Sequence, residues 1–315
     1  MRIDLGTAAE FLFRNDNYLI ITHIRPDGDT LGSAGALCSA LRRMGKTAYL
    51  FPNPETTDRF IPFIEKYISP DDFTPENVIA VDVASENMFA KGFEGKVNLC
   101  IDHHPSNPGY ADMLYLRAEK ASCAEGVLDV ITAIYGKPTP EEADLLYIGL
   151  STDCGCFSYG NVESDTMEAA AALINYGCRH KYLNKYLFKT FSLARLKVEG
   201  AIYANLESLR GGKVNISYLP LETLRACNAT DNDCDDIASL PGNVAGSVVA
   251  ALIREIDEGK CKISVRTSAL VDARKICEPF GGGGHAMASG CTVNMPPLET
   301  MAALKEVIEK VWPAE

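Results

Sequence analysis

Histidine and tryptophan are scarce in this 315-residue sequence, which has five histidines and one tryptophan. It also lacks any apolar run near the about 18 residues of a membrane span, so we expect no membrane partner. The first residues carry no signal-peptide pattern, and the eleven cysteines are odd in number and irregularly spaced. These absences argue against a disulfide-rich secreted protein and predict a cytoplasmic protein with reduced cysteines.

Positive charge is also in short supply, because 30 Lys and Arg stand against 42 Asp and Glu, for a net charge of −12. A surface of that sign repels a long phosphate backbone, which argues against a protein that grips long duplex nucleic acid. Short nucleotides are not excluded. The composition is otherwise globular, with 47% hydrophobic and 23% charged residues, and the length favours two domains.

Short apolar runs alternate with helical patterns in the first part of the chain. The predicted strands are 18–23, 47–51, 78–83, 97–102 and 113–117. The predicted helices are 31–44, 123–135, 141–152 and 164–176. Continuous apolar strands separated by helices are typical of a parallel sheet covered on both faces. Residues 1–190 are therefore predicted to form a doubly wound parallel α/β domain.

The second part of the chain begins with a helical pattern over 182–209, which predicts a connector helix with Ser192 as an N-cap and Gly211-Gly212 as its stop. The remaining patterns predict a strand, a hairpin and two helices, at 214–219, 247–256 with 261–267, 271–279, and 298–311. Residues 191–315 are predicted to form this connector and a smaller α/β domain with a mixed sheet. We expect the active site in the cleft between the domains.

Acids and histidines follow predicted strands at several places in the first domain. These segments are 23–29 (His-Ile-Arg-Pro-Asp-Gly-Asp), 81–83 (Val-Asp-Val), 102–104 (Asp-His-His) and 151–155 (Ser-Thr-Asp-Cys-Gly). Because the carboxyl ends of parallel strands share one edge of the sheet, His23, Asp82 and Asp102 should converge there. That edge is where ligands bind in such sheets.

Convergent carboxylates repel one another unless a cation neutralises them. Ligands that are mostly carboxylate oxygen with some imidazole suit Mn²⁺ or Mg²⁺ better than a structural Zn²⁺. The candidate ligands, two histidines and four aspartates, are too many for one ion and suit two ions that share a carboxylate. Two metals about 3.5–4 Å apart fit a phosphoester hydrolase, because they activate water and clamp the attacking and leaving oxygens.

Each segment taken alone also has a structural interpretation. The Asp-Gly-Asp sequence favours a turn with an N-cap, Asp82 could be a cap residue, and the Asp-His-His sequence could lie in a surface loop. Asp153 beside Cys154 and Cys156 suggests a thiolate zinc site, but the nearest other cysteines lack the paired spacing of zinc ligands. When they follow the strands of a parallel sheet in this order, the four segments together are a far more specific signal for a metal site than any one of them alone.

A run of four glycines precedes His285 in the second domain. It is not a P-loop, because no Gly-Lys-Ser/Thr follows. Glycines let backbone N–H groups approach an anion, and His285 could donate to a phosphate. The alternative is a flexible hairpin tip. Arg266 could likewise bind phosphate or be solvated.

With these motifs, the sequence resembles the DHH phosphoesterase superfamily with a C-terminal DHH-associated domain. It is most similar to the NrnA-type branch of oligoribonucleases and phosphatases of 3′-phosphoadenosine 5′-phosphate (pAp). The resemblance runs from His23 to Gly290 and rests on the motifs at 23–33, 81–83, 101–107, 151–157 and 281–290. Thr30, Cys154 and Ser289 depart from the residues usual in the family, but none is an expected ligand.

The resemblance implies two divalent metal ions, Mn²⁺ or alternatively Mg²⁺, which share the carboxylate of Asp82. It places the first ion on His23, Asp27 and Asp82, and the second on Asp29, Asp82, His103 and Asp153. Asp102 would orient a histidine and raise its basicity. His104 would stabilise phosphoryl oxygens or protonate the leaving group. Ser33 and Asn107 are expected to be supporting residues, and the terminal nucleotide would be held by Arg266, Gly283, Gly284 and His285.

The function that the resemblance implies is Mn²⁺-dependent hydrolysis of short oligoribonucleotides, as an exonuclease, and of pAp, as a phosphatase. One alternative is a cyclic- or linear-dinucleotide phosphodiesterase. A manganese pyrophosphatase would lack the glycine-histidine segment. A non-catalytic nucleotide-binding regulatory module would have lost ligands, whereas every expected ligand is present. We also allow for a homodimer.

Overall fold

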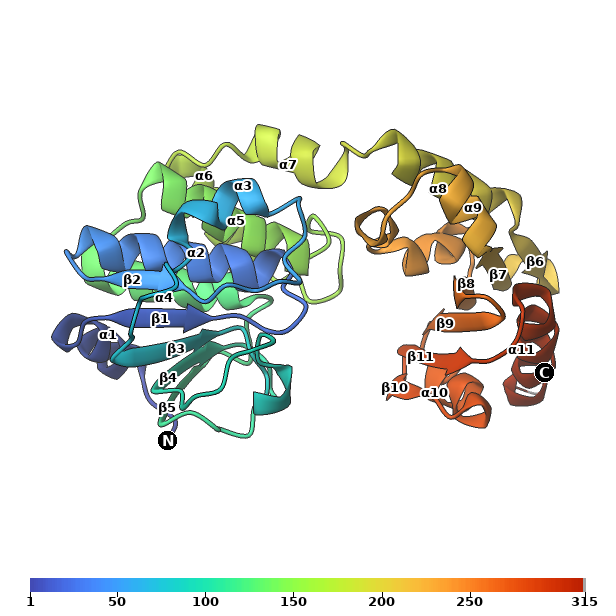
Figure 1. Cartoon of the computed structure of the whole chain (residues 1–315), viewed down its shortest axis with the longest axis horizontal. Helices are drawn as coiled ribbons and strands as arrows, with labels where there is room; N and C mark the ends of the chain where they lie inside the picture. The colour runs from blue at the N-terminus through green and yellow to red at the C-terminus, as the bar shows by residue number, and fades with distance from the viewer. Residues whose placement is uncertain (314–315) are drawn as a thin grey trace. The chain divides into compact units, whose positions relative to one another are not determined.

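The computed structural model describes residues 1–313, which divide into two compact units, the first spanning Met1–Thr190 and the second beginning at Phe191 (Figure 1). Each unit is described by itself. Within residues 1–313, no helix is long and apolar enough to cross a membrane. All eleven cysteines lie in this described part and are free thiols.

The first unit is built on a parallel sheet with the strand order β2-β1-β3-β4-β5. Its strands are β1 (Tyr18–Ile21), β2 (Ala48–Leu50), β3 (Asn77–Val81), β4 (Leu99–Asp102) and β5 (Met113–Leu116). Neighbouring strands pair in parallel, which confirms the predicted parallel sheet. The chain runs from β1 outward to β2 and then returns to β3 on the other side, so the switch point lies between β1 and β3.

The two faces of this sheet are covered differently. Its helices are α1 (Leu5–Arg14), α2 (Gly28–Arg43), α3 (Ile61–Ile64), α4 (Cys123–Tyr135), α5 (Pro140–Asp153), α6 (Ser164–Asn175) and α7 (His180–Phe188), with 3₁₀ turns at Glu65–Tyr67 and Glu86–Met88. Residues of α2, α4 and α5 bury one face of the sheet in the main core (Figure 1). On the other face, Ile21, Ala80 and Cys100 pack against loop residues such as Phe89 and Tyr110.

Helices α2 and α5 pack backbone against backbone because glycines line their contact. A Cβ on Gly32 would lie 2.3 Å from the carbonyl oxygen of Leu145, and one on Gly28 would lie 2.4 Å from Oγ1 of Thr152. Only glycine leaves room for such an approach. The close packing brings the start of α2, with its aspartates, beside Asp153 at the end of α5.

We expect Gly32→Ala to destabilise the protein by about 1–3 kcal/mol, because the new methyl group has only backbone to displace. Gly200→Ala on α8 (Leu193–Ala204) is the matched control, since no atom lies within 4 Å of its Cβ position and alanine favours a helix by about 0.5–1 kcal/mol. Urea unfolding of both variants measures the difference. A Gly32→Ala protein as stable as the wild type would contradict the tight contact.

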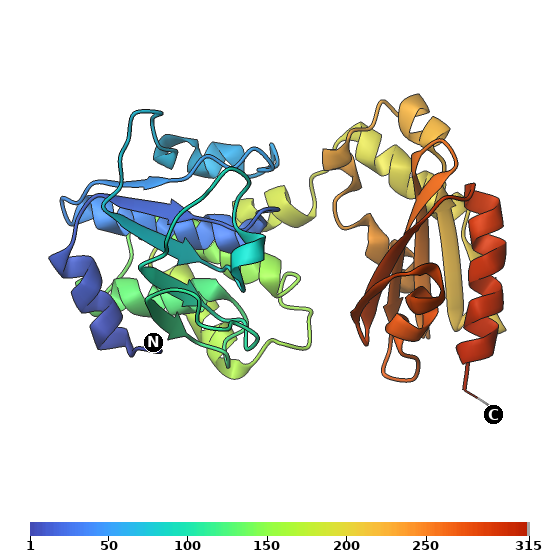
Figure 2. The same cartoon turned by 60° about the horizontal axis from the view of Figure 1, so that its bottom comes forward.

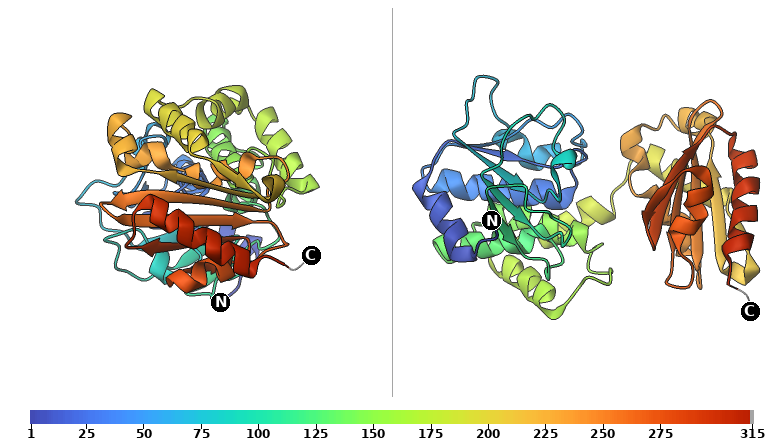
Figure 3. Two further views of the ribbon diagram at one scale, coloured as in Figure 1. Left: turned by 90° about the vertical axis from the view of Figure 1, so that its right-hand side faces the viewer. Right: turned by 90° about the horizontal axis from the view of Figure 1, so that it is seen from below.

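The second unit is built on a mixed sheet, as predicted, and its strand order is β10-β11-β9-β8-β7-β6. Its strands are β6 (Glu207–Leu209), β7 (Val214–Leu219), β8 (Val249–Asp257), β9 (Lys260–Thr267), β10 (Gly283–His285) and β11 (Ala288–Val293). Its helices are α8 (Leu193–Ala204), α9 (Leu221–Ala226), α10 (Ala273–Cys277) and α11 (Pro297–Val311), with 3₁₀ turns at Arg210–Gly212, Asp231–Cys234, Ile237–Asn243 and Glu278–Phe280. Helix α11 lies along one face (Figures 2 and 3), where it shares a core with α10.

The prediction of a single connector helix over 182–209 is wrong. The chain forms two helices there, because Ser192 caps a new helix by accepting a hydrogen bond from Arg195 N (2.9 Å). Helix α8 ends at Ala204, well before Gly211, because the chain then enters the edge strand β6. In place of the helix predicted over 271–279, the chain forms the shorter helix α10 and a 3₁₀ turn. Helix α1 was not predicted.

Candidate active site

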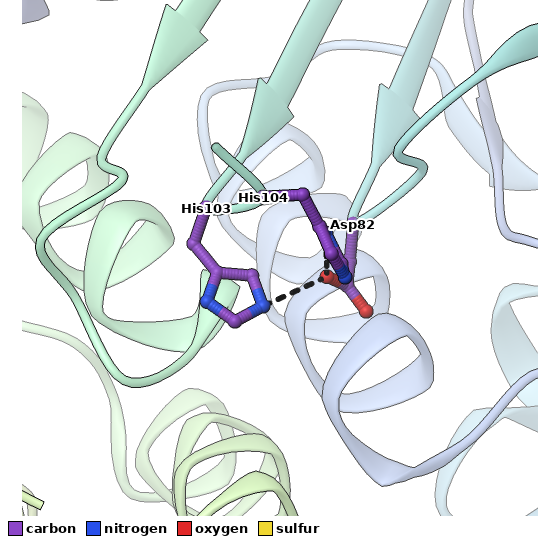
Figure 4. Close-up of side chains that lie close together, drawn as sticks. All are labelled: Asp82, His103 and His104. Carbon is purple, nitrogen blue, oxygen red and sulfur yellow. Dashed lines mark ion pairs between the residues drawn. The ribbon is translucent and has the colours of Figure 1, made fainter. Parts of the chain in front are cut away.

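The acids and histidines of the first unit meet at the switch point of its sheet. His23 follows β1, Asp82 follows β3, and His103 and His104 follow β4, which ends at Asp102. Figure 4 shows Asp82, His103 and His104 pointing toward one another from two neighbouring strands. The predicted convergence of His23, Asp82 and Asp102 is therefore confirmed.

Asp82 lies at the centre of this cluster and offers one oxygen to each side. Its Oδ2 is 3.8 Å from His23 Nε2, and its Oδ1 is 3.5 Å from His103 Nε2 and 3.6 Å from His104 Nδ1. The residue is only 3% exposed, and Oδ1 is buried without a hydrogen-bond partner among the described residues. Its φ of 58° is uncommon for a residue with a side chain and marks a strained position. A buried, unpartnered carboxylate facing imidazoles suits a cation.

The donor atoms fall into three groups, of which one contains the first expected ligand set and another contains three of the four residues expected in the second set. In each group the potential ligand atoms lie within 4.8 Å of one another, and the groups are His23, Asp27 and Asp82; Asp29, His103 and Asp153; and Asp82, His103 and His104. Asp82 adjoins the second set through His103, so its position fits a shared ligand. The residues present therefore fit two divalent cations.

The start of α2 has a structural role as well as a place in the cluster. Asp27 caps the helix by accepting hydrogen bonds from the N–H groups of Asp29 (3.0 Å) and Thr30 (3.2 Å). Its Oδ1 also lies 3.6 Å from His23 Nε2. The turn-and-cap interpretation of Asp-Gly-Asp is thus correct, and the same geometry aims Asp27 at the imidazole.

Asp29 is held by two backbone amides that the sequence did not single out and by Ser33, which was expected to be a supporting residue. Its Oδ2 accepts from Cys123 N (2.6 Å), and its Oδ1 accepts from Ala124 N (3.0 Å) and from Ser33 Oγ (3.0 Å). The two amides belong to the first turn of α4, where the helix dipole favours a negative charge. The Ser-x-x-Glu spacing at 122–125, which forms a capping box, was the available signal.

A backbone hydrogen bond fixes the orientation of His103. Its Nδ1 lies 3.2 Å from the carbonyl oxygen of Lys120, which can only accept, so Nδ1 carries the proton. The lone pair of Nε2 is then free to face Asp82 and Asp153, each 3.5 Å away. Metal-binding histidines are commonly held in this way.

Asp102 orients His104, and both of its oxygens accept hydrogen bonds from the protein. Its Oδ1 accepts from His104 Nδ1 (2.8 Å) and from the backbone N–H groups of His103 (2.8 Å) and His104 (3.2 Å). Its Oδ2 accepts from Asn107 Nδ2 (2.6 Å). The hydrogen bond to Asp102 raises the pKa of His104, whose side chain is 38% exposed. His104 can therefore reach a substrate through its other nitrogen.

The cluster is electrostatically strained as long as no cation is bound. Burial and the neighbouring carboxylate of Asp153 raise the pKa of Asp29 to about 7. Burial and the charge of Asp27 raise the pKa of Asp153 to about 7, and burial with the same aspartates raises that of Asp82 well above its usual range. Bound cations would relieve this repulsion.

We expect the metal-free protein to lose stability as the pH rises from 5 to 8. A carboxyl group that titrates near 7 when folded and near 3.9 when unfolded binds its proton more tightly in the folded state. Its contribution is therefore full below about pH 4 and is lost as the pH passes through 7, at about 1.4 kcal/mol per unit of pKa shift. Thermal unfolding after dialysis against EDTA measures the effect.

Two comparisons make that measurement specific to the cluster. Adding Mn²⁺ should restore stability at pH 8, and Asp153→Asn should flatten the pH dependence because it removes one raised carboxyl group. An unfolding temperature that rises from pH 5 to 8 without metal would contradict the account.

Three of the four residues expected to hold substrate, Gly283, His285 and Arg266, lie on one face of the second sheet, near its edge. His285 on β10 is opposite Ala288 on β11, which is opposite Arg266 on β9. Paired residues project from the same face, so exposed His285 and exposed Arg266 stand two strands apart, about 10 Å between Cα atoms. Gly283 lies opposite Gly290 in the next row of that face.

Gly283 and Gly284 of the glycine run lie in the edge strand β10, which pairs with β11, so this half of the run is not the tip of the hairpin. Gly284 has a φ of +146°, and a Cβ there would lie 2.6 Å from the carbonyl oxygen of Ala288. Strand β10 was missed because its glycines carry no apolar alternation, and β11 was not predicted either.

A parallel sheet with clustered aspartates and histidines at its switch point, followed by a mixed-sheet α/β unit, defines a class of metal-dependent phosphoesterases. Residues 17–150 match the family described as "DHH family, N-terminal domain", and residues 211–312 match the "DHHA1 domain". The chain belongs to the DHH family.

Two relatives show how far the similarity extends. The "Bifunctional oligoribonuclease and PAP phosphatase NrnA" of Thermus thermophilus is 33% identical over 296 residues, which cover 93% of this chain and 88% of the relative. The protein of the same name from Bacillus subtilis is 25% identical over 88% of this chain and 90% of its own.

Solved structures share the fold. An exopolyphosphatase-related protein from Bacteroides fragilis has a TM-score of 0.86 at 20% identity, over 97% of this chain and 95% of its own. An exonuclease RecJ, solved bound to manganese, has a TM-score of 0.55 at 16% identity, over 97% of this chain and 93% of its own. At these identities the likeness shows the fold alone.

Proposed function

We propose that this protein is a metal-dependent phosphoesterase that hydrolyses short oligoribonucleotides, as an exonuclease, and pAp, as a phosphatase. The observation that carries the proposal is the buried carboxylate of Asp82, whose two oxygens face His23 on one side and His103 on the other. The activity printed for the relative that is 33% identical supports the substrates.

The cofactors we propose are two divalent cations, Mn²⁺ in the first place and Mg²⁺ as the alternative. The proposed ligands are His23, Asp27 and Asp82 for one ion, and Asp29, Asp82, His103 and Asp153 for the other. When bound, such a pair activates water and clamps the attacking and leaving oxygens of phosphoryl transfer. Carboxylate-rich donor sets with some imidazole favour hard to borderline ions of this kind.

The residues around the cations have roles of their own. Asp102 fixes the proton of His104 on Nδ1 through the 2.8 Å hydrogen bond, which leaves Nε2 for the substrate. His104 would donate to a phosphoryl oxygen or to the leaving group. Arg266 and His285 would bind the phosphate of the terminal nucleotide, and Gly283 and Gly284 would let the substrate approach the strand closely.

Purified protein offered several substrates with Mn²⁺, Mg²⁺ or EDTA tests the proposal. We expect a 5′-labelled diribonucleotide to release mononucleotide and pAp to release phosphate, with either metal but not with EDTA, and a long duplex to remain intact. Cleavage of a cyclic dinucleotide alone would support the dinucleotide phosphodiesterase instead. Binding without any hydrolysis would support a regulatory module. A cytoplasmic location and a homodimer stay predictions.

A further inference from the structure

The turn that follows Asp153 has an unusual backbone. Gly155, Cys156 and Phe157 have φ values of 53°, 52° and 66°, so three successive residues are left-handed. Residues with side chains rarely adopt this conformation. The turn closes through hydrogen bonds from Ser158 N (3.0 Å) and Tyr159 N (3.2 Å) to the carbonyl oxygen of Cys154. The chain therefore reverses directly beside a proposed metal ligand.

Contacts on both sides fix this turn. Phe157 points inward and packs against Tyr147 of α5, with 6.0 Å between ring centroids. Asn161 Nδ2 donates to the carbonyl oxygens of Asp153 (3.3 Å) and Ala121 (3.2 Å). The turn is thus anchored to the end of α5, which carries Asp153, and to the segment before α4, where the carbonyl oxygen of Lys120 lies against His103.

Tyr159 is the outward-facing aromatic residue of this turn. Its side chain is 60% exposed, although its ring lies against the backbone of Gly155. A Cβ at position 155 would lie 2.3 Å from Cε1 and 2.4 Å from Cζ of the ring, so only glycine lets the ring rest there. The ring is therefore held in place while much of its surface faces solvent.

We propose that Tyr159 is a stacking platform for a nucleobase of the oligoribonucleotide, held in position by Gly155. This inference rests on the proposed function. An exonuclease of short RNA must accept every base, and aromatic stacking is tolerant of sequence because every base has a π-face. A neutral ring also binds the substrate without adding negative charge beside the aspartates of the cluster.

The test compares a triribonucleotide with the same trimer in which the bases are absent, so that the phosphates are identical. For Tyr159→Ala, we expect kcat/KM on the base-bearing trimer to fall about tenfold or more, mainly through KM, and that on the abasic trimer to change less than about twofold. Tyr159→Phe and Tyr159→Trp should retain the preference for bases. Tyr182→Ala on α7, where the tyrosine is 50% exposed, is the matched control and should behave as the wild type.

Gly155→Ala provides a second route to the same result. Its methyl group would displace the ring, so the preference for bases should fall as in Tyr159→Ala, and the double variant should lose no more than Tyr159→Ala alone. A base preference unchanged in Tyr159→Ala, or equal losses on both trimers, would overturn the platform while leaving the proposed function intact. Failure of the wild type to cleave either trimer would overturn both.

Discussion

Replacing Asp82 with asparagine is expected to abolish the binding of both metal ions and to lower kcat/KM at least about 10³-fold. The amide cannot offer a charged oxygen to each side of the cluster, whereas the carboxylate faces His23 through Oδ2 and His103 through Oδ1. A 10³-fold loss corresponds to about 4 kcal/mol of transition-state stabilisation, which is within the range of metal-ion catalysis. Metal analysis after gel filtration and initial rates measure the two effects.

Asparagine is the informative substitution because it tolerates the left-handed backbone at this position, where φ is 58°. The variant should also fold, since it removes a buried carboxylate that has an unpartnered oxygen and whose pKa burial raises. Asp71→Ala, at an exposed acid outside the cluster, is the control and should keep full metal content and activity. Unchanged metal stoichiometry in Asp82→Asn would refute the shared-ligand assignment.

His104→Ala is expected to keep both metal ions and yet to lose about 10²–10⁴-fold in kcat, the usual contribution of a positioned acid or base. His104 is held by Asp102 rather than by the cluster, and its side chain is 38% exposed toward solvent. His103→Ala should instead lose metal, because Nε2 of that ring faces Asp82 and Asp153. The same metal analysis separates the two adjacent histidines.

Equal loss of metal in the two histidine variants would contradict this division of roles. That outcome is meaningful because the donor atoms of Asp82, His103 and His104 also lie within 4.8 Å of one another. The hydrogen bond between His104 Nδ1 and Asp102 is the feature that favours a role toward the substrate.

The central features of the first unit could be predicted from the sequence because they depend on local patterns. Apolar runs such as Tyr18–Ile21 and Leu99–Asp102 form strands that are buried along their whole length, and the acids and histidines follow those strands directly. In a parallel sheet, such positions meet at one edge regardless of the chain between them. The convergence at Asp82 therefore needed no knowledge of loops.

Other features depend on tertiary contacts that no local pattern reveals. Gly32 and Gly149 read as ordinary helix residues, yet a Cβ on Gly149 would lie 2.7 Å from Oδ1 of Asp29. The Ser-x-x-Glu spacing at 122–125 signals where α4 begins, but it does not reveal that the amides of Cys123 and Ala124 hold Asp29. The N-cap predicted at Ser192 is confirmed, but the helical pattern on both sides of it gave no sign that the chain ends one helix and begins another there.

The net negative charge of the chain can be assigned in part to the candidate site. Asp27, Asp29, Asp82 and Asp153 all belong to the cluster, so part of the net charge of −12 is concentrated at the proposed site. Cations bound there would offset these charges, and Arg266 and His285 add exposed donors on the second sheet. Local attraction of a small phosphate is then compatible with general repulsion of a long one.

The most direct test of the account is a crystal structure of the protein with Mn²⁺, in which anomalous scattering locates the ions. We predict two peaks about 3.5–4 Å apart. The first should be bound by His23, Asp27 and Oδ2 of Asp82, and the second by Asp29, His103, Asp153 and Oδ1 of Asp82. A single peak, or two peaks that do not share Asp82, would contradict the two-metal site from which the proposed hydrolysis follows.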